Sequence, residues 1–330
     1  MAQNNRIFYA CQAVVIMPAG HDVAAGGVVK GLQSVGMSSN FTLDQVFEIG
    51  QLEIYENIED VADIEVTLEK VIDGDPLIYT LCSNSLAATS IVAASKQRSD
   101  IYLALYDDGQ DNATGTPRNV CWNSGMYTSS VSYSYSVDGS ATESVTLVGN
   151  DRFWNSQTAL GATGNAKARY GTLVTGFATD APSVAVVRRT NVDIEGSTLP
   201  AIVESQLGTD QGSDKSGAFH IQSISISADF GQENIMELGR FGPYARYATF
   251  PIEVTCEFEV MCTSGDLKNV SGLGTNLTNQ PITIIDDSGT SLALGLKNKM
   301  SSVSYSGGDT GGGNATVSYS FSNFNGLVVS

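Results

Sequence analysis

The chain has 330 residues, and its 35 acidic against 17 basic side chains give a formal net charge of -18. This balance argues against a protein that grips nucleic acid or an anionic membrane, because both surfaces need clustered Lys and Arg. The 34 glycines, the many Ser and Thr and the scarcity of long helical runs predict a mainly β protein, and the length fits two units of ordinary domain size.

The chain opens with a short apolar segment, Ile7 to Cys11, which we interpret as a first strand. A secretory signal is disfavoured, because Gln12 interrupts the segment and Pro18 ends it early. No apolar run reaches the length of a membrane span, so we expect no membrane insertion. The cysteine count is odd and contains no CxxC spacing, which predicts reduced thiols in a protein assembled in a cytoplasm.

A block near the start of the chain returns in its second half. Residues 32–52 read LQSVGMSSNFTLDQVFEIGQL, and residues 221–241 read IQSISISADFGQENIMELGRF. At a constant offset the identical pairs are Gln33 and Gln222, Ser34 and Ser223, Ser38 and Ser227, Phe41 and Phe230, Glu48 and Glu237, and Gly50 and Gly239. Such self-similarity is the signature of a repeated structural unit.

Two further blocks return unchanged and in the same order. Ile64–Thr67 recurs as Ile252–Thr255, and Ser129–Ser134 recurs as Ser301–Ser306. Low-complexity serine explains the last block alone but not the first two. We therefore predict two tandem units related by internal duplication, residues 1–150 and 184–330, joined by a connector at 151–183 that is rich in small residues.

The repeated Ile-Glu-Val-Thr block lies in a segment that alternates apolar and polar residues with period two, which is typical of a half-buried strand. The polar positions of the two copies are Glu65, Thr67 and Glu69, and Glu253, Thr255 and Glu257. Two interpretations stay open for these Glu-Thr-Glu rows: an ordinary solvated face, or a functional acidic surface.

The serine-rich blocks alternate in the same way, with Val131, Tyr133 and Tyr135 on one side of the strand and serines on the other. Turn signals such as Asp138-Gly139 separate the strands. Each unit is thus predicted to be a β-sandwich or partly closed barrel with one short helix. The Ala-rich stretch from Leu86 to Ser95 predicts the first helix; a counterpart of one or two turns is expected between Asp266 and Gly272.

Between the first two repeated blocks, each unit has a segment that we expect to form a long hairpin arm. The first arm is acidic, and the second is basic and aromatic. We hypothesise that the arms touch between stacked neighbouring subunits, where complementary charge fixes register; two solvated loops that diverged after duplication are the alternative. The residues concerned are Glu53, Glu56, Glu59 and Asp60, and Arg240, Tyr244, Arg246 and Tyr247.

Motifs for catalysis or metal binding are not evident in the sequence. His21 and His220 lie in unrelated contexts, and no phosphate loop or dinucleotide fingerprint is present. The carboxylates of Asp107–Asp111 are a candidate calcium loop, but they lack the alternating spacing and terminal Glu of the known one. We expect no enzyme activity, no metal site and no cofactor.

The stretch from Val46 to Leu81, VFEIGQLEIYENIEDVADIEVTLEKVIDGDPLIYTL, resembles the corresponding part of phage tail tube proteins, with a weaker echo at Ile221–Cys262. The resemblance implies β-sandwich units in six-fold rings that stack into a hollow tube, through which the genome passes into the host without specific binding. A doubled unit implies a ring of three chains with pseudo-six-fold symmetry; six chains, each with one unit as an external decoration, is the rival geometry.

The same resemblance implies a virion tail protein, assembled in the host cytoplasm, with other tail proteins as partners: a terminator, a baseplate or tip, a tape measure, and a sheath if the tail contracts. A channel lined with Lys and Arg would stall DNA by binding its phosphates. We therefore hypothesise that the Glu-Thr-Glu rows or the serine faces line the channel.

Two other classes compete with a tail tube subunit. One is another virion or surface structural protein, such as a capsid decoration or sheath-like component. The other is a tandem β-sandwich glycan-binding module, which needs aromatic platforms. Only Trp122 and Trp154 are present, and neither has a counterpart in the second unit.

Overall fold

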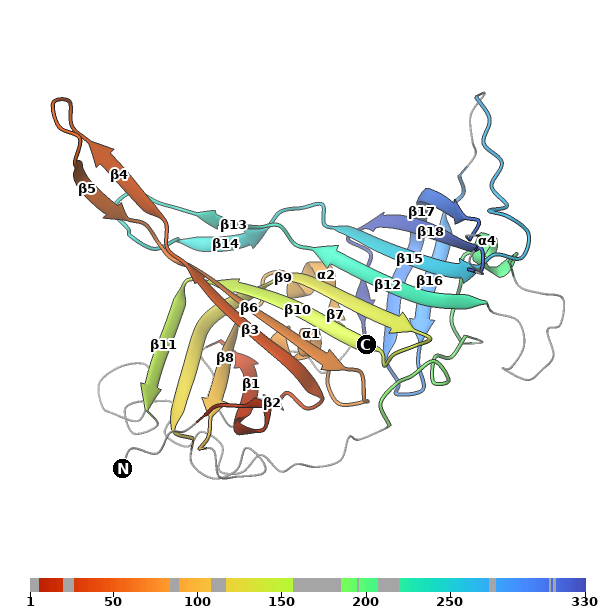
Figure 1. Ribbon diagram of the computed structural model, residues 1–330, viewed down its shortest axis with the longest axis horizontal. Helices are drawn as coiled ribbons and strands as arrows, with labels where there is room; N and C mark the ends of the chain where they lie inside the picture. The colour runs from red at the N-terminus through yellow and green to blue at the C-terminus, as the bar shows by residue number, and fades with distance from the viewer. Residues whose placement is uncertain are drawn as a thin grey trace.

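The computed structural model describes residues 6–19, 27–83, 89–107, 117–156, 185–194, 196–206, 220–272, 277–308, 310 and 313–330. These residues form extended antiparallel sheets with a few short helical turns (Figure 1). The expected mainly β class is confirmed.

Within the described residues, the first half of the chain holds two short helices and a 3-10 turn among eleven strands. The helical segments are η1 Tyr9–Cys11, α1 Ile78–Cys82 and α2 Ile91–Ala94. The strands are β1 Gln12–Pro18, β2 Gly27–Val28, β3 Leu32–Asn40, β4 Leu43–Phe47, β5 Ile54–Glu59, β6 Asp63–Val71, β7 Thr89–Ser90, β8 Ser99–Leu105, β9 Asn119–Ser136, β10 Thr142–Gly149 and β11 Asp151–Ser156.

The described part of the second half contains helix α4 Ala201–Glu204 and eight strands. These strands are β12 Ile221–Asp229, β13 Gln232–Ile235, β14 Ala245–Ala248, β15 Glu253–Met261, β16 Gln280–Ile285, β17 Ser291–Ser306, β18 Thr316–Phe324 and β19 Val328–Val329.

One long sheet runs through both halves, and we call it the central sheet. Its strands follow the order β3-β6-β10-β9-β12-β15-β18-β17, and every neighbouring pair is antiparallel. The first four strands and the last four therefore repeat one arrangement. The halves meet where β9 pairs with β12, and Figure 1 shows the sheet sweeping from one half into the other.

A second layer covers the apolar face of the central sheet in each half. The long strands β9 and β17 take part in both layers: the first part of β9 pairs with β8 and β11, and the first part of β17 pairs with β16 and β19. Near these changes of layer lie Gly125 and Gly295, with φ angles of 62° and 76°. Glycine adopts such angles without strain, so it suits a strand that must bulge and bend there.

The core follows from the period-two alternation along the central strands. Val66 and Leu68 on β6, Ile226 on β12 and Val254 on β15 are completely buried, and one apolar cluster joins both halves. In the described part of the chain the central sheet stays open, with edges at β3 and at the last part of β17. Each half is accordingly an open sandwich, not a closed barrel.

The expected helices and first strand are only partly right. Helix α2 lies inside the predicted Leu86–Ser95 stretch, where the Ser90 hydroxyl accepts the Ala93 N–H at 3.2 Å; residues 84–88 lie outside the described chain. The prediction of a helix at Asp266–Gly272 was wrong: the segment is not helical, and Leu267 has a φ of 55° that no right-handed helix accommodates. The first strand begins at Gln12, since the Cys11 N–H closes a 3-10 turn on the Phe8 carbonyl at 3.0 Å.

The cysteines are free thiols, four of them buried and Cys262 half-buried. Burial raises the pKa of Cys82 to about 12 and that of Cys121 to about 11. Thiols with such pKa values are poor nucleophiles, so they serve as small core residues. Among the described residues, no helix has the length and apolar character needed to cross a membrane.

Candidate assembly surfaces

The two Glu-Thr-Glu rows lie on the same side of the central sheet, opposite the core. On β6, Thr67 and Glu69 are half-buried and Glu65 is exposed; Glu253, Thr255 and Glu257 on β15 are exposed. The strand registers place serines between the two rows: Ser132 lies opposite Ser144 on one side and Ser227 on the other. The predicted acidic rows and serine faces therefore form a single surface, which we call the polar face.

Hydroxyl and carboxylate groups bond to one another along the polar face. The Ser34 hydroxyl donates to Glu69 Oε2 at 3.2 Å, and the hydroxyls of Ser227 and Thr255 lie 2.7 Å apart. Among the described positions of the central strands, the cations on this side are two exposed lysines of β17, Lys297 and Lys299, at one end of the sheet order. A surface of this composition has no row of cations with which to hold a polyanion.

The first arm, β4–β5, projects away from the sheets (Figure 1). Glu53, Glu56, Glu59 and Asp60 all lie on it and are exposed. The charges were predicted, but the apolar side chains beside them were missed: Phe47, Ile49, Leu52 and Tyr55 are 62%, 103%, 101% and 63% exposed. An arm that exposes both apolar and acidic side chains in this way suits contact with another molecule.

The second arm, β13–β14, lies close to the first half of its own chain. Arg246 is only 7% exposed; it donates to Asn234 Oδ1 at 2.7 Å and pairs with Asp63 Oδ1 at 3.2 Å. Arg246 is thus bound within its own chain, to the first residue of β6, whereas Arg240, Tyr244 and Tyr247 are exposed. Contact between the arms of stacked neighbours stays a prediction for these three residues and for the first arm.

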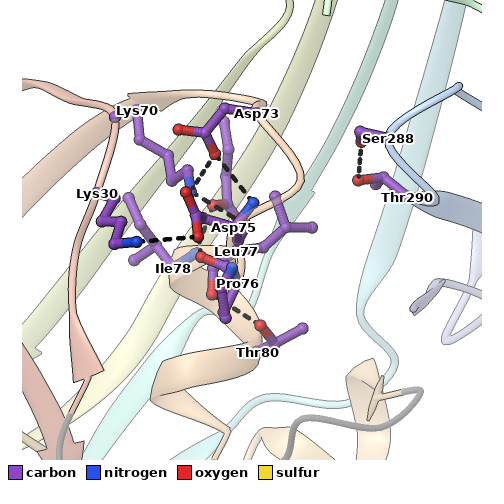
Figure 2. Close-up of polar contacts among 12 residues, drawn as sticks. Lys30, Lys70, Asp73, Asp75, Pro76, Leu77, Ile78, Thr80, Ser288 and Thr290 are labelled. Atoms are coloured by element: carbon purple, nitrogen blue, oxygen red, sulfur yellow. Dashed lines mark hydrogen bonds and ion pairs between the residues drawn. The ribbon is translucent and has the colours of Figure 1, made fainter. Parts of the chain in front are cut away.

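A buried polar cluster lies under the first half of the central sheet (Figure 2). The Lys70 ammonium pairs with Asp73 Oδ1 at 3.1 Å and donates to the carbonyls of Asp75 and Pro76, each at 3.2 Å. On the neighbouring strand β10, Glu143 accepts the backbone N–H groups of the first two residues of α1, Ile78 at 2.6 Å and Tyr79 at 3.1 Å. The cluster therefore fastens α1 to the sheet.

Burial dominates the electrostatics of Glu143. Desolvation raises the pKa of this carboxyl group to about 7, against the opposing effect of the two N–H groups and of Lys70. The hydroxyl of Tyr133 also donates to Glu143 Oε1, at 3.1 Å. With both carboxylate oxygens hydrogen-bonded inside the core, this carboxyl group serves the fold.

The metal and glycan hypotheses gain little from the structure. Asp107 forms an exposed ion pair with Arg118 at 3.5 Å, and the rest of the candidate calcium loop, 108–111, lies outside the described chain. The described residues contain no group of three or more acidic, His or Cys side chains suited to a metal ion. Trp122 is buried in a stack on Tyr102, so of the two tryptophans only Trp154, 50% exposed, offers a surface ring.

No family model matches the chain, and no curated protein matches it. Among solved structures, it is similar to a chain of the anti-feeding prophage (AFP) baseplate, determined by cryo-EM with 6-fold symmetrisation. The similarity covers 46% of this chain and 96% of that one, at 11% identity and a TM-score of 0.33. The similar chain belongs to that baseplate.

Proposed function

We propose that the protein is a structural subunit of a phage tail tube, in which rings stack into a hollow cylinder for genome passage. The observation that carries the proposal is the central sheet. It joins two halves of identical strand order, has one face of hydroxyls and carboxylates, and ends in two unpaired edges in the described chain. Such a sheet is an arc of a larger wall rather than a finished domain.

The chemistry of the polar face suits the inside of that wall. Glu65, Glu69, Glu253 and Glu257 repel DNA phosphates, and the serines between them offer no counterion to release. The opposite face is buried against the second layers, so it cannot line a channel. The proposal therefore assigns the Glu-Thr-Glu rows and the serine face to the lumen.

The doubled arrangement gives a ring of three chains, because each chain supplies two equivalent arcs. Pseudo-six-fold shape with three-fold composition then follows from closed symmetry. The exposed first arm is the part of each subunit best placed to meet the next ring. The remaining tail proteins, a terminator, a baseplate or tip, a tape measure and any sheath, are the further partners of the stack. This role involves no catalysis and no cofactor.

Negative-stain microscopy of the purified protein tests the proposal. We expect hollow cylinders with stacked rings, and native mass spectrometry of a single ring should give three chains of 34.8 kDa each. A monodisperse monomer at all concentrations, or a protein that only coats preformed capsids, contradicts a tube and favours a decoration protein. A ring of six chains keeps the tube but removes the two-arc geometry.

The lumen assignment has a separate test. Replacing Glu65 and Glu257 together by Lys should leave cylinders intact and make them bind DNA in a salt-dependent way. The matched control is a pair of Lys substitutions at Asp138, in the turn between β9 and β10, and Glu204, on α4, which are exposed acidic residues outside the central strands and the arms. Equal DNA binding by both variants would place the polar face on the outer wall.

A further inference from the structure

We infer that the free edge of β17, Ser302–Ser306, pairs antiparallel with β3 of a second copy of this chain, in the register that β9 and β12 show inside one chain. The inference rests on the proposed ring and names its subunit contact. The junction between the two halves serves as the template, because each of its strands has a counterpart, β17 or β3, that is paired on one side only within the described residues.

The first observation is that one six-residue sequence occurs in two strands with different numbers of neighbouring strands. Ser129–Ser134 on β9 and Ser301–Ser306 on β17 are identical. In β9 these residues have β10 on one side and β12 on the other, and Tyr133 is 1% exposed. In β17 the described chain supplies β18 alone, and Tyr305 is 54% exposed. The second segment therefore exposes side chains that its twin buries.

The complementary strand shows the same contrast. The core-facing residues Ile226 on β12 and Phe230 directly after it are completely buried. Their counterparts at the start of the repeat are Met37, half-buried on β3, and Phe41, which is 75% exposed. A large aromatic side chain exposed beside an unpaired strand edge is the signature of an interface that its own chain does not complete.

The packing of Phe230 predicts which residues Phe41 should contact. The Phe230 ring lies 6.2 Å from the ring of Tyr79 on α1, which follows β6. In the second half, the segment after β15 occupies the same place in the chain order, and it exposes Leu267 and Val270 at 41% and 80%. Phe41 of one copy therefore has an apolar partner on the next copy that is likewise uncovered.

The internal junction also fixes which residues face each other. There, Ser132 lies opposite Ser227 and Tyr133 opposite Ile226. Carried to the matched positions, this register places Ser304 of one copy opposite Ser38 of the next, and Tyr305 opposite Met37.

The hydrogen-bond pattern adds the spacing of each pair. The Phe230 N–H donates to the Ser129 carbonyl at 2.8 Å, so Ser129 belongs to a hydrogen-bonded pair. Alternation along an antiparallel ladder makes Ser132 and Ser227 a non-hydrogen-bonded pair, with Cα atoms about 4.5 Å apart. Ser304 and Ser38 inherit this close spacing, which disulfide geometry accepts.

Cysteine cross-linking tests the register. The double variant Ser304→Cys with Ser38→Cys should form intermolecular disulfides under mild oxidation, with a covalent trimer as the largest product on a non-reducing gel. The mismatched variant Ser304→Cys with Ser34→Cys, displaced by about 13 Å along β3, should cross-link at least tenfold less. Ser132→Cys with Ser227→Cys is the positive control and should close within one chain.

The outcomes separate this inference from the tube itself. Cross-links without cylinders support the edge pairing and contradict the tube, whereas cylinders in which the matched and mismatched variants cross-link equally overturn the register. A ladder that runs to six chains keeps the pairing and excludes three-chain closure. No intermolecular disulfide in either variant overturns the pairing.

The Phe41 contact has its own matched pair of substitutions. Phe41→Ala should leave the melting temperature of the monomer unchanged and raise the concentration needed for assembly by about tenfold or more, as expected for a central aromatic contact. Phe230→Ala, at the matched buried position, should lower the melting temperature instead. Assembly of Phe41→Ala at the wild-type concentration would remove Phe41 from the interface.

Discussion

One matched pair of core positions holds charged residues in the first half and aromatic residues in the second. In the first half, Lys70 on β6 lies opposite Glu143 on β10; in the second, Phe258 on β15 lies opposite Tyr319 on β18. All four side chains are completely buried. The same pair of strands thus holds a charged cluster in one copy and two aromatic rings in the other.

This difference goes together with the helix. In the first half the charged cluster binds the start of α1 through Glu143 and through the carbonyls beside Lys70. In the second half no helix follows β15 within the described residues, and Tyr319 instead donates to the Asp266 carbonyl at 2.9 Å and accepts from Gln206 at 2.8 Å. A buried ion cluster costs desolvation; here it fixes an element that the other half does without.

The largest effect should come from breaking the charged cluster at Lys70. Lys70→Met leaves Asp73 and Glu143 buried without their cation, and we expect the free energy of unfolding to fall by about 3–5 kcal/mol, measured by urea denaturation. Phe258→Met is the matched control in the second half and should cost less than about 1.5 kcal/mol, since a flexible apolar side chain refills the site. Equal losses in the two variants would show that Lys70 acts by filling volume alone.

The pH dependence of stability should come next in size and should belong to the first half. Because the folded-state pKa of Glu143 is raised from 4.5 to about 7, the folded state binds the proton more tightly than the unfolded state. The contribution of Glu143 is therefore most favourable at low pH and declines as pH rises through this range. Relative to Glu143→Gln, the wild type should lose about 2–3 kcal/mol of unfolding free energy between pH 5 and pH 8.

Parallel denaturation series of wild type and Glu143→Gln at five pH values measure this difference and remove the titration of all other groups. The matched second-half variant, Tyr319→Phe, leaves Glu143 in place and should follow the wild-type pH trend. A constant difference between wild type and Glu143→Gln across the range would mean that the carboxyl group titrates normally in the core.

The alternation of the strands made much of this architecture predictable from the sequence. Period two placed Thr67 and Thr255 outside and Val66 and Val254 inside, and the repeated blocks correspond to strands in matching places. The same rule puts Lys70 in phase with Val66 and Leu68, and Glu143 in phase with Val145, so both were detectable as core-facing charges. Their pairing was not detectable, because it depends on which strands become neighbours.

The edges and arms were beyond local pattern for the same reason. Nothing in Ser129–Ser134 and Ser301–Ser306 distinguishes a strand with two neighbours from one with a single neighbour, since the residues are identical. The burial of Arg246 likewise depends on Asp63, far away in the chain, whereas local charge suggested a free arm. Non-local pairing decides these features, and one chain's periodicity does not encode it.

The contact between the second arm and the first half should contribute moderately. Arg246→Ala removes bonds to Asn234, Asp63 and Asn150, of which Asp63 is 61% exposed and therefore well hydrated without its partner. We expect a loss of about 1–2 kcal/mol in urea denaturation. Arg240→Ala, on the exposed end of the same arm, should change stability by less than about 0.5 kcal/mol.

If the two substitutions cost the same, Arg246 contributes no more than a surface charge, and the arm is free to move as a whole. Hydrogen exchange of β14 offers a second readout, because a loosened root should speed exchange in Ala245–Ala248 of Arg246→Ala alone.

The smallest effect is expected on the polar face, where replacing the repeated threonines, Thr67 and Thr255, compares the stability of the two halves. The Thr255 and Ser227 hydroxyls lie 2.7 Å apart, whereas the Thr67 and Thr146 hydroxyls lie 3.4 Å apart. Valine keeps the β-branched shape and removes the hydroxyl, so each loss isolates one bond. Because Thr255 is exposed and the Thr67 contact is the longer one, we expect no more than about 0.5–1 kcal/mol for Thr255→Val and a smaller loss for Thr67→Val. A larger loss at Thr67 would mean that the half-buried first row depends on its hydroxyls more than the exposed second row does, and that the polar faces of the two halves differ as their cores do.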